Sequence, residues 1–154
     1  MKDSKILFLA SWVLLLVMTS LITLFSLGSL GTAYFGSQDN LTSAVGLEQI
    51  TAAGGEEAAD AFRGRRATAA TWALADGFLS LLLVLIPYRR GERWAWWALL
   101  LSLGLSQLLS MARALTLGTT VGTGAAGLIF GLLMLGLLAG APRIFGERRR
   151  EASL

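Results

Sequence analysis

Four apolar runs, each close to the length that crosses a lipid bilayer, constrain this chain more than any other feature. A helix rises about 1.5 Å per residue, so about 20 residues cross roughly 30 Å of hydrocarbon. We expect these membrane helices at residues 6–27, 67–86, 94–117 and 121–141. The apolar residues come in blocks, which makes the chain 55% hydrophobic and only 15% charged. The sequence therefore predicts an all-α integral membrane protein, an antiparallel four-helix bundle formed as one domain over residues 1–154.

The first run has a competing interpretation as a secretory signal peptide. A short basic segment precedes residues 6–27, which contain no ionisable side chain, and Gly31-Thr32-Ala33 offers small residues to a signal peptidase. However, the apolar core of a typical signal peptide is only about 7–15 residues long. We therefore favour a membrane helix that is retained.

Residues 29–66 form the longest stretch without a membrane-length apolar run and predict a longer first extracytoplasmic loop. Asp39 and Asn40 can cap a short amphipathic helix that runs to about Ala53 and ends at Gly54-Gly55. Carboxylates then precede arginines, as the macrodipole of a helix that begins there favours. The carboxylates of this loop are Asp39, Glu48, Glu56, Glu57 and Asp60. They can be interpreted as a divalent-cation site, but no calcium-loop spacing is present, so we favour a solvated acidic cap without metal.

The segment between the second and third runs carries a helix stop, arginines and tryptophans, which is typical of a membrane–water boundary. Pro87 is predicted to end the second helix, and residues 87–93 to form a cytoplasmic loop. The interface anchors that we assign here are Arg89, Arg90, Arg93, Trp94, Trp96 and Trp97. With both termini also inside, the cytoplasmic side carries nine cations and the outer side three. This balance predicts a multi-pass protein of the plasma (inner) membrane with cytoplasmic N- and C-termini. Pro142 is expected to end the last helix, and residues 142–154 form a basic cytoplasmic tail.

Asp76 is the only carboxylate within a predicted membrane run. Counting back from the end of that run puts it near mid-bilayer, where an ionised carboxylate costs several kcal/mol. Serines recur at helical spacing in the third run, where Ser106 and Gln107 reach about the depth of Asp76. We predict an intramembrane polar pocket formed by Asp76, Ser106, Gln107, Ser110 and Arg113. Two interpretations stay open, a proton or ligand site and a hydrogen bond between helices from a protonated carboxyl.

Glycines at helical spacing in the last run predict a close helix contact. Gly124, Gly127 and Gly131 share one face, and Gly136 and Gly140 add a second pair. In lipid, small faces let backbones approach closely, and dispersion contacts then hold the helices together. We favour packing of the first face inside one chain over packing between two chains.

The sequence Pro87-Tyr88-Arg89-Arg90-Gly91-Glu92-Arg93-Trp94-Ala95-Trp96-Trp97, between the second and third of four membrane helices, resembles that of small bacterial integral membrane proteins of the DoxX-like families. The resemblance implies a left-handed antiparallel four-helix bundle with a longer first outer loop. A more distant likeness is to the four-helix sterol-isomerase and sigma-2-receptor superfamily, whose members place acidic residues in a lipid-accessible pocket. Only Asp76 matches those acidic residues here, because the predicted membrane runs contain no second carboxylate. The chain also has no His.

The residue inventory limits the chemistry that this chain can perform. It has no Cys, which excludes disulfides and thiolate metal sites, and no His, the commonest general base. The net charge is +3, but the basic residues lie at the ends of apolar runs, so nucleic acid is not an expected partner. We expect no cofactor, and as partners the lipid bilayer with a lipid-like ligand or a membrane-protein partner. The first hypothesis is a non-enzymatic structural or accessory subunit, or a binder of a lipid-like molecule. The alternative is a small transporter or membrane enzyme that uses the pocket at Asp76.

Overall fold

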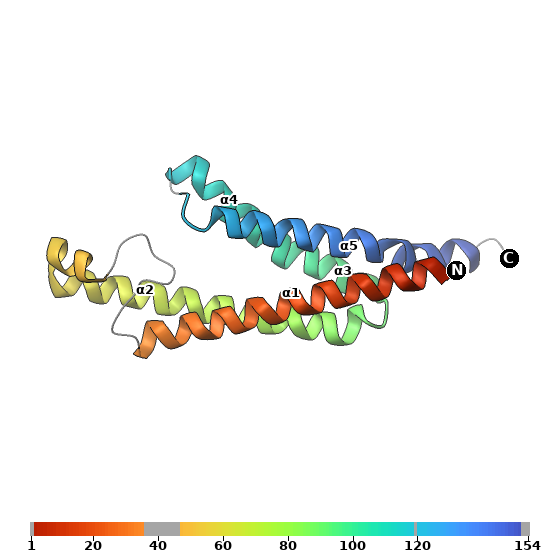
Figure 1. Ribbon diagram of the computed structural model, residues 1–154, viewed down its shortest axis with the longest axis horizontal. Coiled ribbons are helices and arrows are strands. Elements are labelled where there is room, and N and C mark those ends of the chain that lie inside the picture. The colour runs from red at the N-terminus through yellow and green to blue at the C-terminus, as the bar shows by residue number, and fades with distance from the viewer. Residues whose placement is uncertain (1, 36–46, 119, 152–154) are drawn as a thin grey trace.

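The computed structural model describes residues 2–35, 47–118 and 120–151, and all regular structure in these ranges is helical. Four helical stretches are long and apolar enough to cross a membrane: Ser4–Phe35, Glu48–Tyr88, Arg93–Leu117 and Thr123–Gly146. They run back and forth along one long axis, with both chain ends at the same end of the molecule (Figure 1). The prediction of an all-α chain with four membrane-length helices is confirmed.

The first two helices extend beyond the predicted membrane runs. α1 covers Lys2–Phe35, and α2 covers Leu47–Leu83 with a kink at Gly55, whose φ of 77° is favourable for glycine. Within residues 29–66, which we predict to lie outside the membrane, the described parts up to Phe35 and from Leu47 onward are helical. Which of these residues leave the membrane stays a prediction. The short helix predicted to end at Gly54-Gly55 matches the segment before the kink, but its predicted start lies outside the described residues.

Two π-helical turns lie where the second and third spans face each other. α2 continues into η1, Val84–Tyr88, and the third span consists of α3, Arg93–Leu99, then η2, Leu100–Gly104, and α4, Leu105–Leu117. Pro87 was predicted to end its helix and instead lies inside η1, one residue before the helical stretch ends. A proline clashes with the preceding turn of a regular α-helix, and the wider π turn gives its ring room.

The last helix, α5, covers Thr123–Glu151 and continues through Pro142, so the prediction that this proline ends the helix is wrong. Contacts beyond the proline account for the difference. Ile144 is buried and its carbonyl accepts a hydrogen bond of 3.1 Å from Arg93 Nε, while the Arg143 guanidinium lies 4.4 Å from the Phe8 ring centroid. These contacts hold the last turns against the neighbouring helices and offset the roughly 3 kcal/mol that an interior proline costs.

The four spans pack together in one half of the molecule and diverge in the other. α1 packs against α2 and α5, α5 against α4, and α2 against α3 and η2. Among the described residues, however, no Cα atom of α2 lies within 8 Å of one of α4, and α4 contributes no buried residue. Figure 1 shows the α1–α2 pair and the α4–α5 pair separating away from the termini. The predicted bundle is thus closed around its core only in the half that holds both chain ends, which we call the inner half.

Candidate functional site

Tyr88 joins three helices in the inner half. Its side chain is fully buried, and its hydroxyl lies 2.5 Å from Ser11 Oγ of α1. Ser11 donates its own hydrogen to the Gly136 carbonyl of α5 at 2.6 Å, so the Tyr88 hydroxyl is the donor to Ser11. A Cβ atom at Gly140 would collide with the Tyr88 hydroxyl, and one at Gly136 would lie 2.7 Å from Leu15 Cδ2. The second glycine pair therefore provides the close approach that small residues permit in lipid.

Indole groups make two further connections between helices, α1 with η1 and α3 with α5, through backbone carbonyls. Trp12 Nε1 donates to the Val84 carbonyl at 3.1 Å, and Trp96 Nε1 donates to the Leu137 carbonyl at 2.8 Å. Trp96 is only 8% exposed, whereas Trp94 and Trp97 are exposed, and its role as an interface anchor stays a prediction. Its position on the helix face that also carries buried Leu99 explains the difference, because that face points into the core.

The loop arginines also divide into two kinds. Arg89 lies with its guanidinium 5.2 Å from the Trp12 ring centroid, and Arg93 lies 5.5 Å from that of Phe145. Such cation–π contacts stabilise by about 0.5–1 kcal/mol at exposed sites. Arg90, in contrast, keeps 71% of its side chain exposed and approaches only Glu92, at 4.0 Å. The sequence could not separate these roles, because it does not show towards which neighbour each arginine points.

Asp76 lies half-buried beside a close contact of α1 and α2. A Cβ atom at the next residue, Gly77, would lie 3.1 Å from Thr23 Oγ1. No hydrogen bond or ion pair joins Asp76 to another described residue. One turn further, Ser80 is 1% exposed and its hydroxyl has no hydrogen-bond partner among the described residues. Sequence reasoning did not identify Ser80, although it lies four residues from Asp76 on the same helix face.

The residues predicted to pair with Asp76 bond within their own helix. Ser106 Oγ donates to the Leu103 carbonyl at 3.0 Å, and Gln107 Nε2 lies 3.4 Å from Ser106 Oγ. Exposed Arg113 donates through Nε to the Ser110 carbonyl at 3.4 Å. Because α2 and α4 diverge, the structure does not bring these side chains into contact with Asp76, and a shared pocket stays a prediction. Ser102, one turn below Ser106, has a buried hydroxyl without a partner among the described residues.

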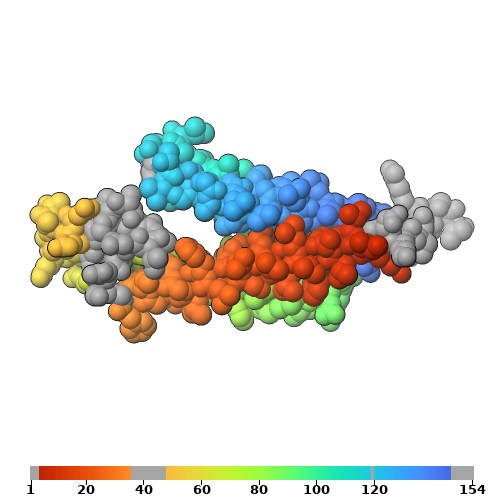
Figure 2. All heavy atoms as spheres, viewed as in Figure 1, coloured from red at the N-terminus to blue at the C-terminus, as the bar shows by residue number. Residues whose placement is uncertain are grey.

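An apolar groove lies between α1 and α5, where these helices begin to separate. Its volume is about 420 Å³. It is lined by Met18, Leu21, Ile22, Phe25, Ser26, Ala125, Leu128, Ile129 and Leu132. Figure 2 shows α1 and α5 meeting near the termini and moving apart towards their other ends. We call this feature the α1–α5 groove, and the sequence pattern did not predict it.

The first glycine face lies near this groove but makes no close helix contact. Nothing lies within 4 Å of a Cβ atom built at Gly124 or Gly131, and only Met111 Cε reaches that distance at Gly127. The described residues therefore provide no tight contact for this face, and whether it packs inside one chain or between two stays a prediction. The divergence of the outer helix halves leaves Gly124 and Gly131 open.

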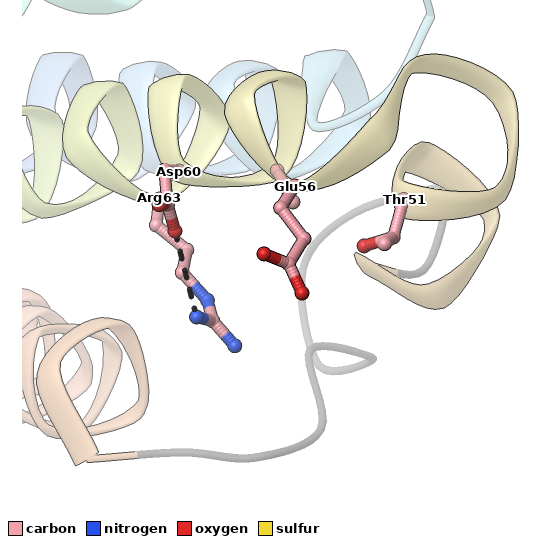
Figure 3. A pocket seen from close by; sticks show the side chains of 5 residues that line it. Thr51, Glu56, Asp60 and Arg63 are labelled. Atoms are coloured by element: carbon pink, nitrogen blue, oxygen red, sulfur yellow. Dashed lines mark ion pairs between the residues drawn. The ribbon is translucent and has the colours of Figure 1, made fainter.

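A polar hollow of about 330 Å³ lies at the opposite end of α2 from the loop arginines. Figure 3 shows Glu56, Asp60 and Arg63 on one side of this helix, with Thr51 across the kink. Arg63 and Asp60 form an ion pair of 3.8 Å in which both side chains are largely exposed. Exposed pairs contribute about 0–1 kcal/mol, so this end of α2 is a solvated charged segment.

A scan against protein-family models, a search of curated proteins and a search of solved structures each returned no match. The class of protein follows from the fold alone. This is an all-helical protein with four helices that are long and apolar enough to cross a membrane.

Proposed function

We propose that this multi-pass membrane protein is non-enzymatic and holds a lipid-like molecule in the α1–α5 groove. The groove itself is the observation that carries the proposal. Its volume of about 420 Å³ falls within the range of small-molecule sites, about 300–1,000 Å³. Eight of its nine lining residues are apolar, so it offers dispersion contacts to a hydrocarbon chain or ring system.

The groove also carries one polar group that can orient such a ligand. Ser26, which is 5% exposed, is the single hydroxyl among the lining residues. A hydroxyl both donates and accepts a hydrogen bond, so it can bind the polar end of a mostly apolar molecule. Beyond the closely packed inner half, α1 and α5 separate, and this separation gives the ligand an opening from the bilayer.

The site is tested by filling it. Ala125→Trp places a large ring in the groove at an exposed alanine, so no core contact is lost. The matched control is Leu135→Trp, on an exposed position of the same helix that does not line the groove. Native mass spectrometry of protein purified from its own membrane should show a bound apolar molecule in the wild type and control, and lose it in Ala125→Trp. Equal ligand occupancy in all three proteins, or none in the wild type, contradicts the proposal.

The membrane and the orientation are part of the same proposal. The excess of cations at the end with both termini and residues 87–93 supports cytoplasmic termini in a bacterial inner membrane. The likeness of the residue 87–97 segment to DoxX-like proteins supports a place in that group. Labelling of a C-terminal tag by an impermeant reagent in intact cells would contradict this orientation and show that the C-terminus lies outside.

A second function, a small transporter or membrane enzyme, is favoured by Asp76. Its half-buried carboxyl has no described partner, and the unpartnered Ser80 hydroxyl lies one turn away on the same helix. An asparagine keeps hydrogen bonding but cannot exchange a proton. Normal growth and ligand binding in Asp76→Asn exclude a proton-coupled function. Loss of transport or catalysis while the ligand still binds supports one.

A further inference from the structure

A second groove lies between the end of α2 with η1 and the start of α3, at the end of the helices where the loop arginines gather. Its volume is about 340 Å³. It is lined by Leu79, Leu82, Leu83, Ile86, Pro87, Arg90, Glu92 and Trp94. The first five residues give it an apolar floor, and the last three place charge and an indole at its mouth. It shares no lining residue with the α1–α5 groove.

The mouth of this groove is held in a fixed shape by the turn after η1. Gly91 has a φ of 79° and donates to the Tyr88 carbonyl at 2.8 Å, and the Glu92 amide donates to the Pro87 carbonyl at 3.0 Å. The Trp94 indole donates to Glu92 Oε2. The Glu92 carboxylate is thus fixed at the mouth, with Arg90 Nη1 4.0 Å from its other oxygen.

Arg90 is the loop arginine that serves this groove. The guanidinium groups of Arg89 and Arg93 lie over the Trp12 and Phe145 rings, whereas Arg90 lines the groove and keeps 71% of its side chain exposed. The planar guanidinium of arginine matches phosphate oxygens in a bidentate manner. Glu92, whose side chain is 37% exposed, adds a carboxylate that can accept from an ammonium group.

We propose that this groove binds a phospholipid whose headgroup carries both a phosphate and a primary ammonium, as in phosphatidylethanolamine. The phosphate binds Arg90, the ammonium binds Glu92, and an acyl chain lies along the apolar floor. Trp94 flanks the headgroup at the depth where indoles favour the membrane interface. A phosphatidylglycerol headgroup offers no cation to Glu92, and the quaternary ammonium of phosphatidylcholine has no N–H to donate.

Three lipids with identical acyl chains distinguish these headgroups. The purified full-length protein is titrated with each lipid, and bound adducts are measured by native mass spectrometry. We expect phosphatidylethanolamine to bind about tenfold more tightly than phosphatidylcholine or phosphatidylglycerol. Of the three lipids it alone can donate a charge-assisted hydrogen bond from an ammonium group to Glu92, and one such bond provides a difference of this size. Equal binding of the three lipids, or preference for either of the other two, overturns the proposal.

Two variants separate the roles of the charges. Glu92→Gln keeps the size and an acceptor for Trp94, and should remove the roughly tenfold preference for phosphatidylethanolamine while phosphate binding persists. Arg90→Gln should weaken the binding of all three lipids. The control Arg63→Gln, at the other end of α2, should leave their binding unchanged. An unaltered preference in Glu92→Gln contradicts the assignment. Retention of the preference in Ala125→Trp distinguishes this groove from the α1–α5 groove.

Discussion

The hydroxyl of Tyr88 lies 2.5 Å from Ser11 Oγ, although 77 residues separate the two side chains in the sequence. Ser11 Oγ donates a hydrogen bond to the Gly136 carbonyl, so a chain of two hydrogen bonds connects η1, α1 and α5. Both oxygens lie in a buried region, where an unmade hydrogen bond is costly. This connection joins η1, α1 and α5 in the inner half, where the bundle is closed.

Tyr88→Phe removes one of these two hydrogen bonds and keeps the ring. The stacked contact with Phe8, at 5.7 Å between centroids, should persist. We expect a loss of about 0.5–1.5 kcal/mol in the free energy of unfolding, measured by thermal or denaturant unfolding in detergent. The control Tyr34→Phe alters a tyrosine that is 63% exposed at the far end of α1 and should not change stability. Equal stability of the two variants would show that the Tyr88 hydroxyl contributes nothing.

Gly140→Ala tests the close approach of α5 to the same hydroxyl. The added methyl group meets Tyr88 and lies 2.8 Å from Ser11 Oγ, so the helices must move apart. Overpacking of this kind costs about 1–3 kcal/mol, which a lower melting temperature should report. Gly131→Ala is the matched control, because nothing lies within 4 Å of its added methyl and alanine favours the helix. A larger loss in Gly131→Ala than in Gly140→Ala would contradict the observed packing.

Asp76→Leu tests whether the carboxyl has a structural role. It breaks no hydrogen bond or ion pair with a described residue, and it replaces a polar group within a membrane-length helix by an apolar one. We expect stability equal to the wild type or higher by roughly 1–3 kcal/mol, read from the unfolding transition. A clear destabilisation would instead identify Asp76 as a partner in a helix contact.

The four membrane-length helices could be predicted because block hydrophobicity is a property of the sequence alone. Which side of a helix meets a neighbour is not. Gly127 and Gly131 have the same four-residue spacing as Gly136 and Gly140, yet only the second pair lies tightly against other helices. The difference comes from where α5 crosses α1 and η1.

The candidate site was predictable to the same limited degree. Helix geometry puts Asp76 and Gln107 at a similar depth, and that depth estimate is independent of their lateral separation. The divergence of α2 from α4 decides that separation, and it arises from long-range packing in the inner half. Local propensity predicts that the helix ends at Pro142. Contacts of Arg143 and Ile144 with neighbouring helices outweigh that propensity, and the helix continues.

Disulfide trapping tests the separation of the outer helix halves most directly, because the chain contains no native cysteine. A disulfide requires Cα atoms within about 7 Å of each other. In lipid nanodiscs under oxidising conditions, the pair Thr23→Cys with Gly77→Cys should cross-link α1 to α2, since a Cβ atom at Gly77 lies 3.3 Å from Thr23 Cα. The pair Asp76→Cys with Gln107→Cys should stay reduced, because no Cα atoms of α2 and α4 lie within 8 Å. Rapid and complete cross-linking of Asp76→Cys with Gln107→Cys would contradict the open arrangement.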